Sequence, residues 1–321
     1  MSDSQVDILE NSIRRHDGLL DVLLLDRTRT TASKSHNILW ATDSYEGHKP
    51  KEEIQVEDIT GKNTRLIQPR IAKSKEEQKS RTRDKAEVFT PTEIVKSMNV
   101  QIDNSSPSWP ALKDNWQNYI KELRLEITCG EAPFIVNRYN AASGIKVKKL
   151  SERVGFLDRK LRIASENCSD ENSWLEWATV AFQCSYGYEW QGDNLLLARE
   201  NLLYTFIDYW NDKFPSDKIN LNRQVSSEKL KILEDIAIII SWNIFQMDGL
   251  KYVVPMSCKS EIATAEIPPM LALLGEKPDK KLSRKQCPGC AKNDPHLHNG
   301  KYVKIMDWQK HKPIKFVDLL K

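Results

Sequence analysis

The spacing of apolar and polar positions changes in the middle of the chain, around a cysteine and a glycine. Between Leu123 and Ile127 apolar and charged residues alternate, which is the period of a β-strand. From Glu131 to Tyr139 the pattern is that of a helix, and Pro133 is tolerated in the first turn of such a helix. A strand that ends in a glycine turn before a helix can hold a cofactor, although such turns also occur in α/β proteins that bind nothing there.

Helical spacing of apolar residues recurs further along the chain. It is found in residues 150–167, 172–183, 194–210 and 227–241. Two short extended segments, residues 184–190 and 243–250, carry Glu189 and Asp248 near their ends. The alternation of strands and helices predicts an α/β fold with an open, mainly parallel sheet.

The first 84 residues have a different pattern. Two apolar runs, residues 19–31 and 36–46, predict a small β-hairpin, and residues 59–70 carry a short strand signal. Residues 71–85 are highly charged and predict an exposed helix or a linker, whose basic side chains would either meet phosphates or form a solvated face. We therefore divide the chain into an N-terminal β element with a charged linker (1–84), a core (85–255) and a C-terminal region (256–321).

The composition is that of a globular protein, because 321 residues with 40% hydrophobic content can fill a core. The formal net charge is only +3, so nucleic-acid binding would need a local basic patch. The longest aliphatic run, residues 236–240, is too short for a membrane span, and the acidic, polar N-terminus does not resemble a signal peptide. We therefore expect a cytoplasmic protein with six reduced cysteines.

An acidic residue lies at the end of each predicted strand of the core. They are Glu126, which is followed by Cys129 and Gly130, then Glu189, then Asp248. Ligands of doubly wound sheets bind beyond the carboxyl ends of the strands, so we expect these acids to converge. The second acid is placed to accept from ribose hydroxyls and the third from an adenine amino group. Their order predicts an adenosine pocket, although each acid alone is more often a surface carboxylate.

A second chemical signal lies in the C-terminal region, where Cys287 and Cys290 form a Cys-x-x-Cys pair. Two thiolates on one turn point to the same side, so a tetrahedral zinc needs only two more ligands. His296 and His298 are closer together than paired zinc-binding histidines usually are, so one of them with Cys258 is the expected completion. We take His298 as the fourth ligand of a zinc knuckle; His296 in its place, or a reduced turn without metal, stays an alternative.

Four segments together resemble one protein family. Residues 86–95 (AEVFTPTEIV) are similar to the Phe-Thr-Pro segment that precedes the core of adenine-specific DNA methyltransferases from restriction–modification systems. Residues 125–135 (LEITCGEAPFI) resemble their strand and turn, residues 186–203 (YGYEWQGDNLLLARENLL) the segment of the second strand, and residues 243–250 (NIFQMDGL) the third-strand acid. The resemblance implies a Rossmann-like sheet, S-adenosylmethionine as cofactor, and methyl transfer to adenine N6 in DNA, as in the modification subunits of such systems.

The same resemblance implies roles for individual residues. The methionine end of the cofactor would be lined by Phe89, Thr90 and Pro91 and by the turn at Glu126, Cys129 and Gly130. Glu189 would take the ribose hydroxyls and Asp248 the adenine amino group. From the sequence pattern alone, without the family resemblance, Thr92 after the proline is predicted to cap a helix. One departure is Ala132, which stands where many members have glycine and is followed by Pro133.

The family's acceptor loop is a polar residue followed by Pro-Pro and an aromatic residue, and it holds the amine of a base flipped from the duplex. Here Pro268–Pro269 is flanked by Ile267 and Met270, which supply neither the acceptor nor the ring. Asn243 has the acceptor without the prolines. We therefore expect a second subunit to supply this loop or target recognition, while a truncated product or a subunit without chemistry also fits. The alternative function is a non-catalytic DNA-binding or scaffold protein.

Overall fold

The computed structural model describes residues 12–13, 16, 18–85, 87–88, 90–108, 112–263 and 283–320. At its centre is a parallel sheet with the strands in the order β1 (Arg124–Glu126), β2 (Ser185–Glu189) and β3 (Ile244–Gln246). Glu126 is in register with Gly187, and Glu189 with Gln246, so the carboxyl ends of the strands share one edge. The prediction of a mixed α/β protein with a parallel sheet is confirmed.

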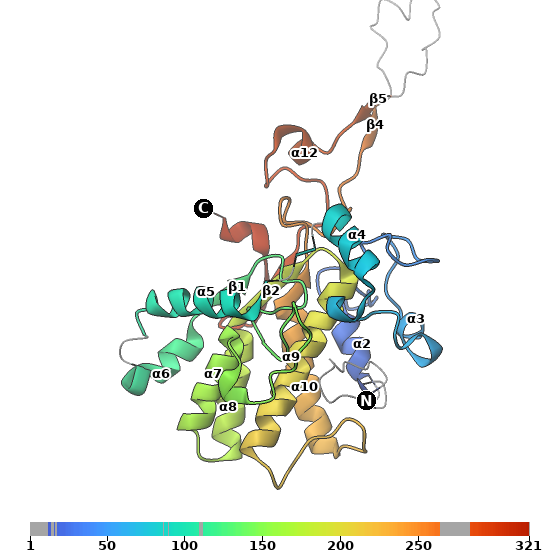
Figure 1. The fold of residues 1–321 in the computed structure, drawn as a ribbon. Coiled ribbons are helices and arrows are strands. Elements are labelled where there is room, and N and C mark those ends of the chain that lie inside the picture. The colour runs from blue at the N-terminus through green and yellow to red at the C-terminus, as the bar shows by residue number, and fades with distance from the viewer. Residues whose placement is uncertain are drawn as a thin grey trace, which may run out of the picture.

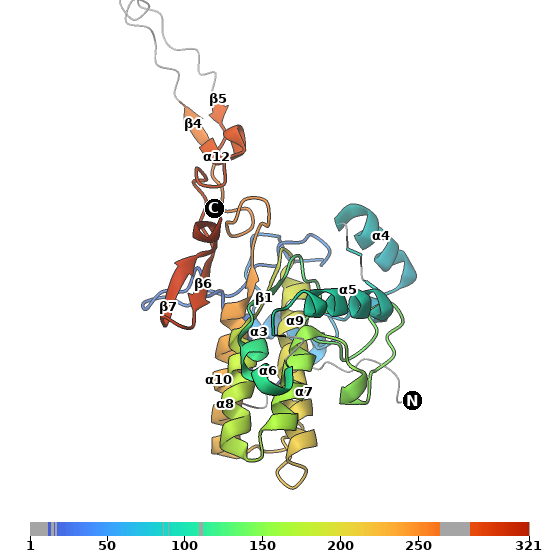
Figure 2. The ribbon, with the colours of Figure 1, turned by 90° about the vertical axis from the view of Figure 1, so that its left-hand side faces the viewer.

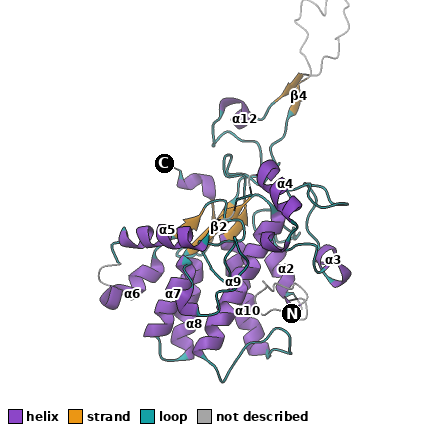
Figure 3. Cartoon of the chain, viewed as in Figure 1, coloured by secondary structure: helices purple, strands orange, loops and turns teal. Residues whose placement is uncertain are grey.

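Four long helices gather on one side of this sheet (Figures 1 and 3). They are α7 (Phe156–Asn167), α8 (Glu171–Gln183), α9 (Gly192–Lys213) and α10 (Ser227–Asn243), close to the predicted segments. Helix α8 begins where Asp170 accepts the N–H of Ser173, and α10 where Ser226 accepts the N–H of Lys229. Between the helices lies an aromatic core, in which the ring of Trp174 packs edge-on against another tryptophan.

The C-terminal part of the chain covers the other face of the sheet. There β6 (Lys304–Asp307) and β7 (Lys312–Lys315) form an antiparallel hairpin that leads into the 3₁₀ helix η4 (Phe316–Leu319). The ring centroid of Phe316 lies 6.2 Å from that of Tyr188 in β2 and 5.6 Å from that of Phe245 in β3. Figure 2 shows this hairpin beside the sheet. Because side chains alternate along a strand, β2 and β3 are packed on both faces, as strands of parallel sheets usually are.

The predicted N-terminal β-hairpin is only partly right: Leu25 and Asn37 form an antiparallel bridge between the two runs, but Leu19–Leu24 forms helix α2. Its leucines are buried and pack mainly against α10, so the apolar run serves a helix face rather than a strand. The carbonyl oxygens of Leu23 and Leu25 accept from the buried guanidinium of Arg199. The strand signal at residues 59–70 is also wrong: this stretch holds the end of α3 (Val56–Ile59), the 3₁₀ helix η1 (Gly61–Asn63) and turns that lead to η2 (Arg70–Ala72).

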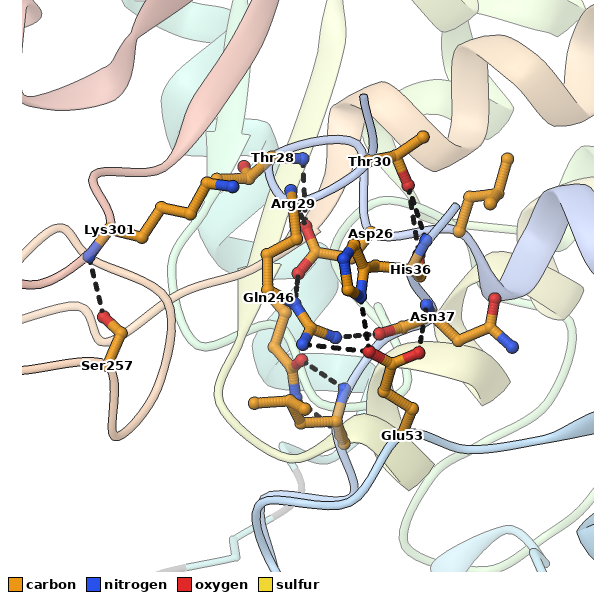
Figure 4. Close-up of polar contacts among 12 residues, drawn as sticks. Asp26, Thr28, Arg29, Thr30, His36, Asn37, Glu53, Gln246, Ser257 and Lys301 are labelled. Carbon is orange, nitrogen blue, oxygen red and sulfur yellow. Dashed lines mark hydrogen bonds and ion pairs between the residues drawn. The ribbon is translucent and has the colours of Figure 1, made fainter. Parts of the chain in front are cut away.

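Polar side chains hold the second half of the expected hairpin (Figure 4). The Glu53 carboxylate lies 2.7 Å from His36 Nδ1, accepts the N–H of Asn37 and pairs with Arg29. Burial alone would raise the pKa of Glu53, but these three neighbours outweigh it and lower the pKa. The Gln246 amide both donates to and accepts from the backbone of Leu39, so this segment is bonded to the end of β3 by a side chain.

The charged segment forms helix α4 (Lys75–Lys85), which confirms the helical alternative of the prediction. Its exposure is only partly as expected, because Arg81 is 2% exposed and Lys73, just before the helix, is 8% exposed. Arg81 donates to Asp193 at 2.7 Å and to Glu87 at 2.6 Å. The opposite charges of Asp193 in α9 and of Glu87 explain this burial, and Asp193 could not be matched to α4 from the sequence.

The helix expected from Glu131 to Tyr139 is wrong, because the structure has turns there. The carboxylate of Glu126 accepts the N–H groups of Phe134 and Ile135, which holds the chain in a tight loop against the end of β1. A strand-end acid therefore replaces the hydrogen bonds that a helix would have formed. After this loop the chain continues irregularly to the 3₁₀ helix η3 (Leu150–Glu152).

The remaining elements flank the central layers. Helices α5 (Thr92–Asn104) and α6 (Leu112–Lys121) precede β1, and the arms β4 (Glu261–Ala263) and β5 (Ser283–Lys285) lead to the short helix α12 (Pro288–Lys292). Helix α5 begins as predicted, but Pro91 occupies the cap position and the Thr92 hydroxyl makes no hydrogen bond within the described chain. None of the described helices has the length and apolarity needed to cross a membrane.

Candidate cofactor cleft and metal centre

Three cysteines and one histidine converge beside the carboxyl edge of the sheet. The Nδ1 atom of His298 lies 3.6 Å from the sulfur of Cys258, 3.5 Å from that of Cys287 and 3.7 Å from that of Cys290. All four ligand atoms lie within 4.8 Å of one another. Zinc bound tetrahedrally at ordinary zinc–sulfur and zinc–nitrogen distances places sulfur and nitrogen about 3.6 Å apart. The cluster therefore has the dimensions to hold a metal ion such as zinc.

The local backbone explains how these four side chains meet. Cys287 caps α12, Pro288 stands in its first turn, and Cys290 follows one turn later. Gly289 lies under the histidine, since a Cβ there would be 2.6 Å from the backbone nitrogen and from Nδ1 of His298. Only glycine allows this approach, so the Cys-Pro-Gly-Cys sequence is suited to the site. Four protein ligands with no open position are typical of a structural rather than a catalytic zinc site.

The surroundings of the sulfurs differ from one cysteine to another. Burial and the facing sulfur of Cys287 raise the pKa of Cys258 to about 12. Burial also acts to raise the pKa of Cys287, but the N–H groups of Asn299 and Cys290 and the ring of His298 lower it to about 6. The Asn299 N–H donates to the Cys287 sulfur at 3.2 Å. Such a donor supports a thiolate, which is the form that binds metal.

The structure thus brings the predicted ligand set together in full, and His298 is the one of the two candidate histidines that lies in the cluster. His298 is buried in the cluster, whereas His296 is exposed and outside it. The His298 N–H donates to the hydroxyl of Tyr302, which in turn donates to the carbonyl of Pro295. These bonds fix the loop that carries the histidine.

A cleft of about 770 Å³ opens at the carboxyl ends of β1 and β2. Among the residues that line it are five of the predicted cofactor contacts: Thr90, Glu126, Cys129, Gly130 and Glu189. Glu189 holds the cleft's shape, since its carboxylate accepts the N–H of Gly130 at 2.9 Å and that of Gln191 at 3.1 Å. The acid at the end of β2 is therefore bonded directly to the glycine turn after β1. Burial raises the pKa of both Glu126 and Glu189.

The turn itself contains three left-handed residues within five positions. The φ angles are +46° at Thr128, +53° at Gly130 and +64° at Ala132. Glycine adopts this conformation freely, but a residue with a Cβ is strained by about 1–2 kcal/mol. Ala132 thus occupies a backbone position that suits glycine, which gives a physical reason for the glycine expected there. Strained backbone of this kind concentrates at ligand-binding turns.

Other predicted contacts lie elsewhere. Asp248 is not among the residues that line the cleft; its carboxylate accepts the N–H groups of Leu250 and Lys251 and pairs with the Lys251 ammonium at 3.3 Å. Pro91 caps α5 and does not line the cleft either. Phe89 lies outside the described residues, as does the Pro268–Pro269 segment. The roles assigned to these residues stay predictions.

Asn243, the other candidate acceptor, is fully used by the fold. Its amide nitrogen donates to the carbonyl groups of Phe182, Gln183 and Ser185, and its oxygen accepts from Trp308. It stands at the amino end of β3, away from the carboxyl edge where the cleft opens. This agrees with the expectation that Asn243 does not hold a target amine.

Sequence reasoning missed two polar groups of the cleft. Glu87 and Asn194 line it, are 6% and 2% exposed, and come from the segment before the Phe-Thr-Pro motif and from the first turn of α9. Within the described chain, Glu87 Oε1 and Asn194 Oδ1 accept no hydrogen bond. Buried acceptors of this kind are costly unless a donor satisfies them. The only sequence signal was their place inside the resembling segments.

No protein-family model matches the chain, and neither does a curated protein or a solved structure.

Proposed function

We propose that the chain is an S-adenosylmethionine-binding modification subunit of a DNA restriction–modification system, with a Rossmann-like sheet and adenine N6 methylation as the reaction of the assembled enzyme. The proposal rests on one observation. The Glu189 carboxylate accepts the N–H of Gly130 at the mouth of a cleft, and this cleft opens at the carboxyl edge of the sheet. Open parallel sheets bind their ligands at this edge. The cleft's volume lies within the range of roughly 300–1,000 Å³ that small-molecule sites occupy.

The charge of the cleft favours a cationic ligand with many hydrogen-bond donors. Its lining contains the carboxylates of Asp84, Glu87, Glu126 and Glu189 and the guanidinium of Arg83, which pairs with Asp84. S-adenosylmethionine brings a sulfonium, an ammonium and two ribose hydroxyls to such a surface. A nucleoside triphosphate would instead bring several negative charges close to four acids. Within the described chain, Oε1 of Glu87 and Oδ1 of Asn194 accept no hydrogen bond, so they add two positions that a donor would satisfy.

Each carboxylate has a distinct task in this proposal. The two oxygens of Glu189 each accept one backbone N–H and retain a further lone pair for the ribose hydroxyls. Glu126 shapes the loop at residues 131–136 through two backbone bonds, so it positions the cleft wall. When bound, S-adenosylmethionine supplies an activated methyl group that an amine can attack. The chain's own contribution is to bind and orient this donor.

A second subunit is part of the proposal, because it would supply the acceptor loop or target recognition. Leu125 of β1 is 42% exposed and Ile127, just beyond the strand, is 64% exposed. In the described sheet β1 pairs only with β2, so its other edge is open. Exposed apolar residues along an open strand edge favour a partner, since parallel sheets are normally covered there. A non-catalytic scaffold that keeps this framework is the alternative, and cofactor binding separates the two.

Competition between ligands tests the proposal. Isothermal titration of the purified chain should show S-adenosylmethionine binding, while ATP at the same concentration should neither bind nor compete. Glu189→Gln should weaken S-adenosylmethionine binding, because a hydrogen bond to a charged group contributes about 1.5–3 kcal/mol. Binding of ATP in preference to S-adenosylmethionine, or of neither, would reject the proposed cofactor.

A further inference from the structure

We infer that the described part of the C-terminal module, residues 251–263 and 283–320, is the surface that contacts the phosphate backbone of nucleic acid. The inference rests on the proposed function, since it assigns a place to the DNA that the assembled enzyme would modify. The whole chain has a net charge of +3, but residues 251–321 contain 14 Lys and Arg against 7 Asp and Glu, a net of +7, and the described residues 251–263 and 283–320 account for 10 of these basic and 4 of these acidic residues, a net of +6. The first 250 residues therefore carry a net of −4. Such an asymmetry within one chain favours a polyanionic partner for the basic part.

The structure concentrates this charge on exposed side chains without acidic partners. In the described part of the module, no ion pair is formed by the exposed residues Lys259, Lys292, Lys301, Lys304, Lys312 and Lys315. By contrast, Lys310 pairs with Asp307, and Lys251 with Asp248. The six unpaired ammonium groups are therefore available to a ligand. Phosphate contacts of this kind supply most of the affinity of sequence-independent DNA binding.

The β6–β7 hairpin holds two of these unpaired lysines side by side. Lys304 of β6 and Lys315 of β7 lie directly opposite each other in the antiparallel register, and both are exposed. Like charges in this position destabilise a hairpin, so the pair needs another reason to be there. The Lys315 ammonium lies 5.6 Å from the ring centroid of Tyr302, which holds it over the outer face. A phosphate group between the two ammonium groups would turn the repulsion into attraction.

The position of the module is compatible with a DNA-contacting surface. Cys258, which lies in the chain after β3, meets the loop of His298 in the metal cluster. In Figures 1 and 2 α12, β4 and β5 project beyond the sheet, on the side away from the bundle of α7 to α10. The Ser257 hydroxyl accepts the N–H of Lys301, which is drawn in Figure 4.

Binding of a fluorescent DNA duplex tests the inference by anisotropy over a range of salt concentrations, with the full chain and zinc present. The double variant Lys304→Gln/Lys315→Gln should weaken binding, and the slope of log affinity against log salt should fall by about 2, one for each lost phosphate contact. The matched control is Lys75→Gln/Lys79→Gln, which removes the same charge from the exposed face of α4. This control should leave the slope within about 0.5 of wild type.

Further readouts separate the possible failures. Both variants should keep wild-type zinc content and S-adenosylmethionine affinity, because neither pair touches the metal ligands or lines the cleft. An equal loss of DNA binding in both variants, or a loss only in the α4 variant, would overturn the inference. So would binding of the wild-type chain to phosphatidylserine vesicles but not to DNA. Failure of S-adenosylmethionine binding with the DNA result intact would reject the proposed cofactor and leave the phosphate surface standing.

Discussion

Replacing His298 by alanine tests the metal centre sharply, because the chain offers a matched control two residues away. His298 is buried, with Nδ1 3.5 to 3.7 Å from three sulfurs, whereas His296 is exposed and lies outside the cluster. His298→Ala therefore removes one of four ligands, and His296→Ala removes none. Any general effect of losing a histidine from this loop is shared by the two variants.

The expected magnitude follows from the ligand count. Structural zinc sites bind with apparent free energies of about 10–16 kcal/mol, so an equal share per ligand is about 2.5–4 kcal/mol. His298→Ala should then weaken zinc binding by roughly 100-fold or more, and His296→Ala by less than about two-fold. The module should also lose thermal stability in the first variant, because metal binding and local folding are linked.

The assay is a competition for zinc against a coloured chelator, preceded by elemental analysis of protein purified without chelator. Wild type and His296→Ala should contain about one zinc per chain and release it at the same chelator concentration. His298→Ala should arrive largely empty or release zinc much earlier. Equal zinc affinity of the two histidine variants would refute the ligand assignment, and a wild-type protein free of metal would refute the site.

Three further outcomes are expected. In urea unfolding, Ala132→Gly should stay within about 0.5 kcal/mol of wild-type stability, because the relief of left-handed strain offsets the lost methyl group. The control Ala178→Gly, inside α8, should lose about 1–2 kcal/mol of stability. Equal losses in the two variants would show that Ala132 is unstrained. Burial lowers the pKa of Lys160 to about 7, so the unfolded chain binds more protons than the folded chain between that pH and about 10.4. The stability of wild type relative to Lys160→Met should therefore rise by up to about 4 kcal/mol between pH 7 and 10. A stability difference between the two proteins that does not change with pH in urea unfolding would contradict this. The isolated chain should transfer no tritiated methyl group to DNA, and a partner with an Asn-Pro-Pro-Tyr loop should restore transfer; robust activity of the chain alone would show that the acceptor was misjudged.

The elements that could be predicted are those whose own residues carry the signal. Helices α9 and α10 and strands β2 and β3 follow from local periodicity. The candidate metal ligands follow from a Cys-x-x-Cys turn, which needs only two more ligands. In each case the deciding interactions lie within a short stretch of chain or in a small set of chemically distinctive residues.

The failures have a common physical cause, which is an interaction with a distant residue. The loop after β1 is held by the Glu126 carboxylate, and α2 by the guanidinium of Arg199 far along the chain. Arg81 is buried because Asp193 meets it, and Glu87 and Asn194 share a cleft only after α4 and α9 have packed. Periodicity contains no information about such partners. The sequence therefore predicted Glu126 and Glu189 as cleft residues but not Glu87 and Asn194.

Hydrogen exchange with and without S-adenosylmethionine tests the central claim most directly, because it locates the ligand. Saturating cofactor should slow amide exchange in residues 127–135 and 189–195, the two segments that supply most of the cleft's lining, around the glycine turn and the start of α9. Residues 217–226, which line a separate cleft between α9 and α10, are the internal control and should exchange as before. Protection of the control segment alone, or no protection anywhere at a saturating concentration, would contradict the assignment of the carboxyl-edge cleft as the cofactor site.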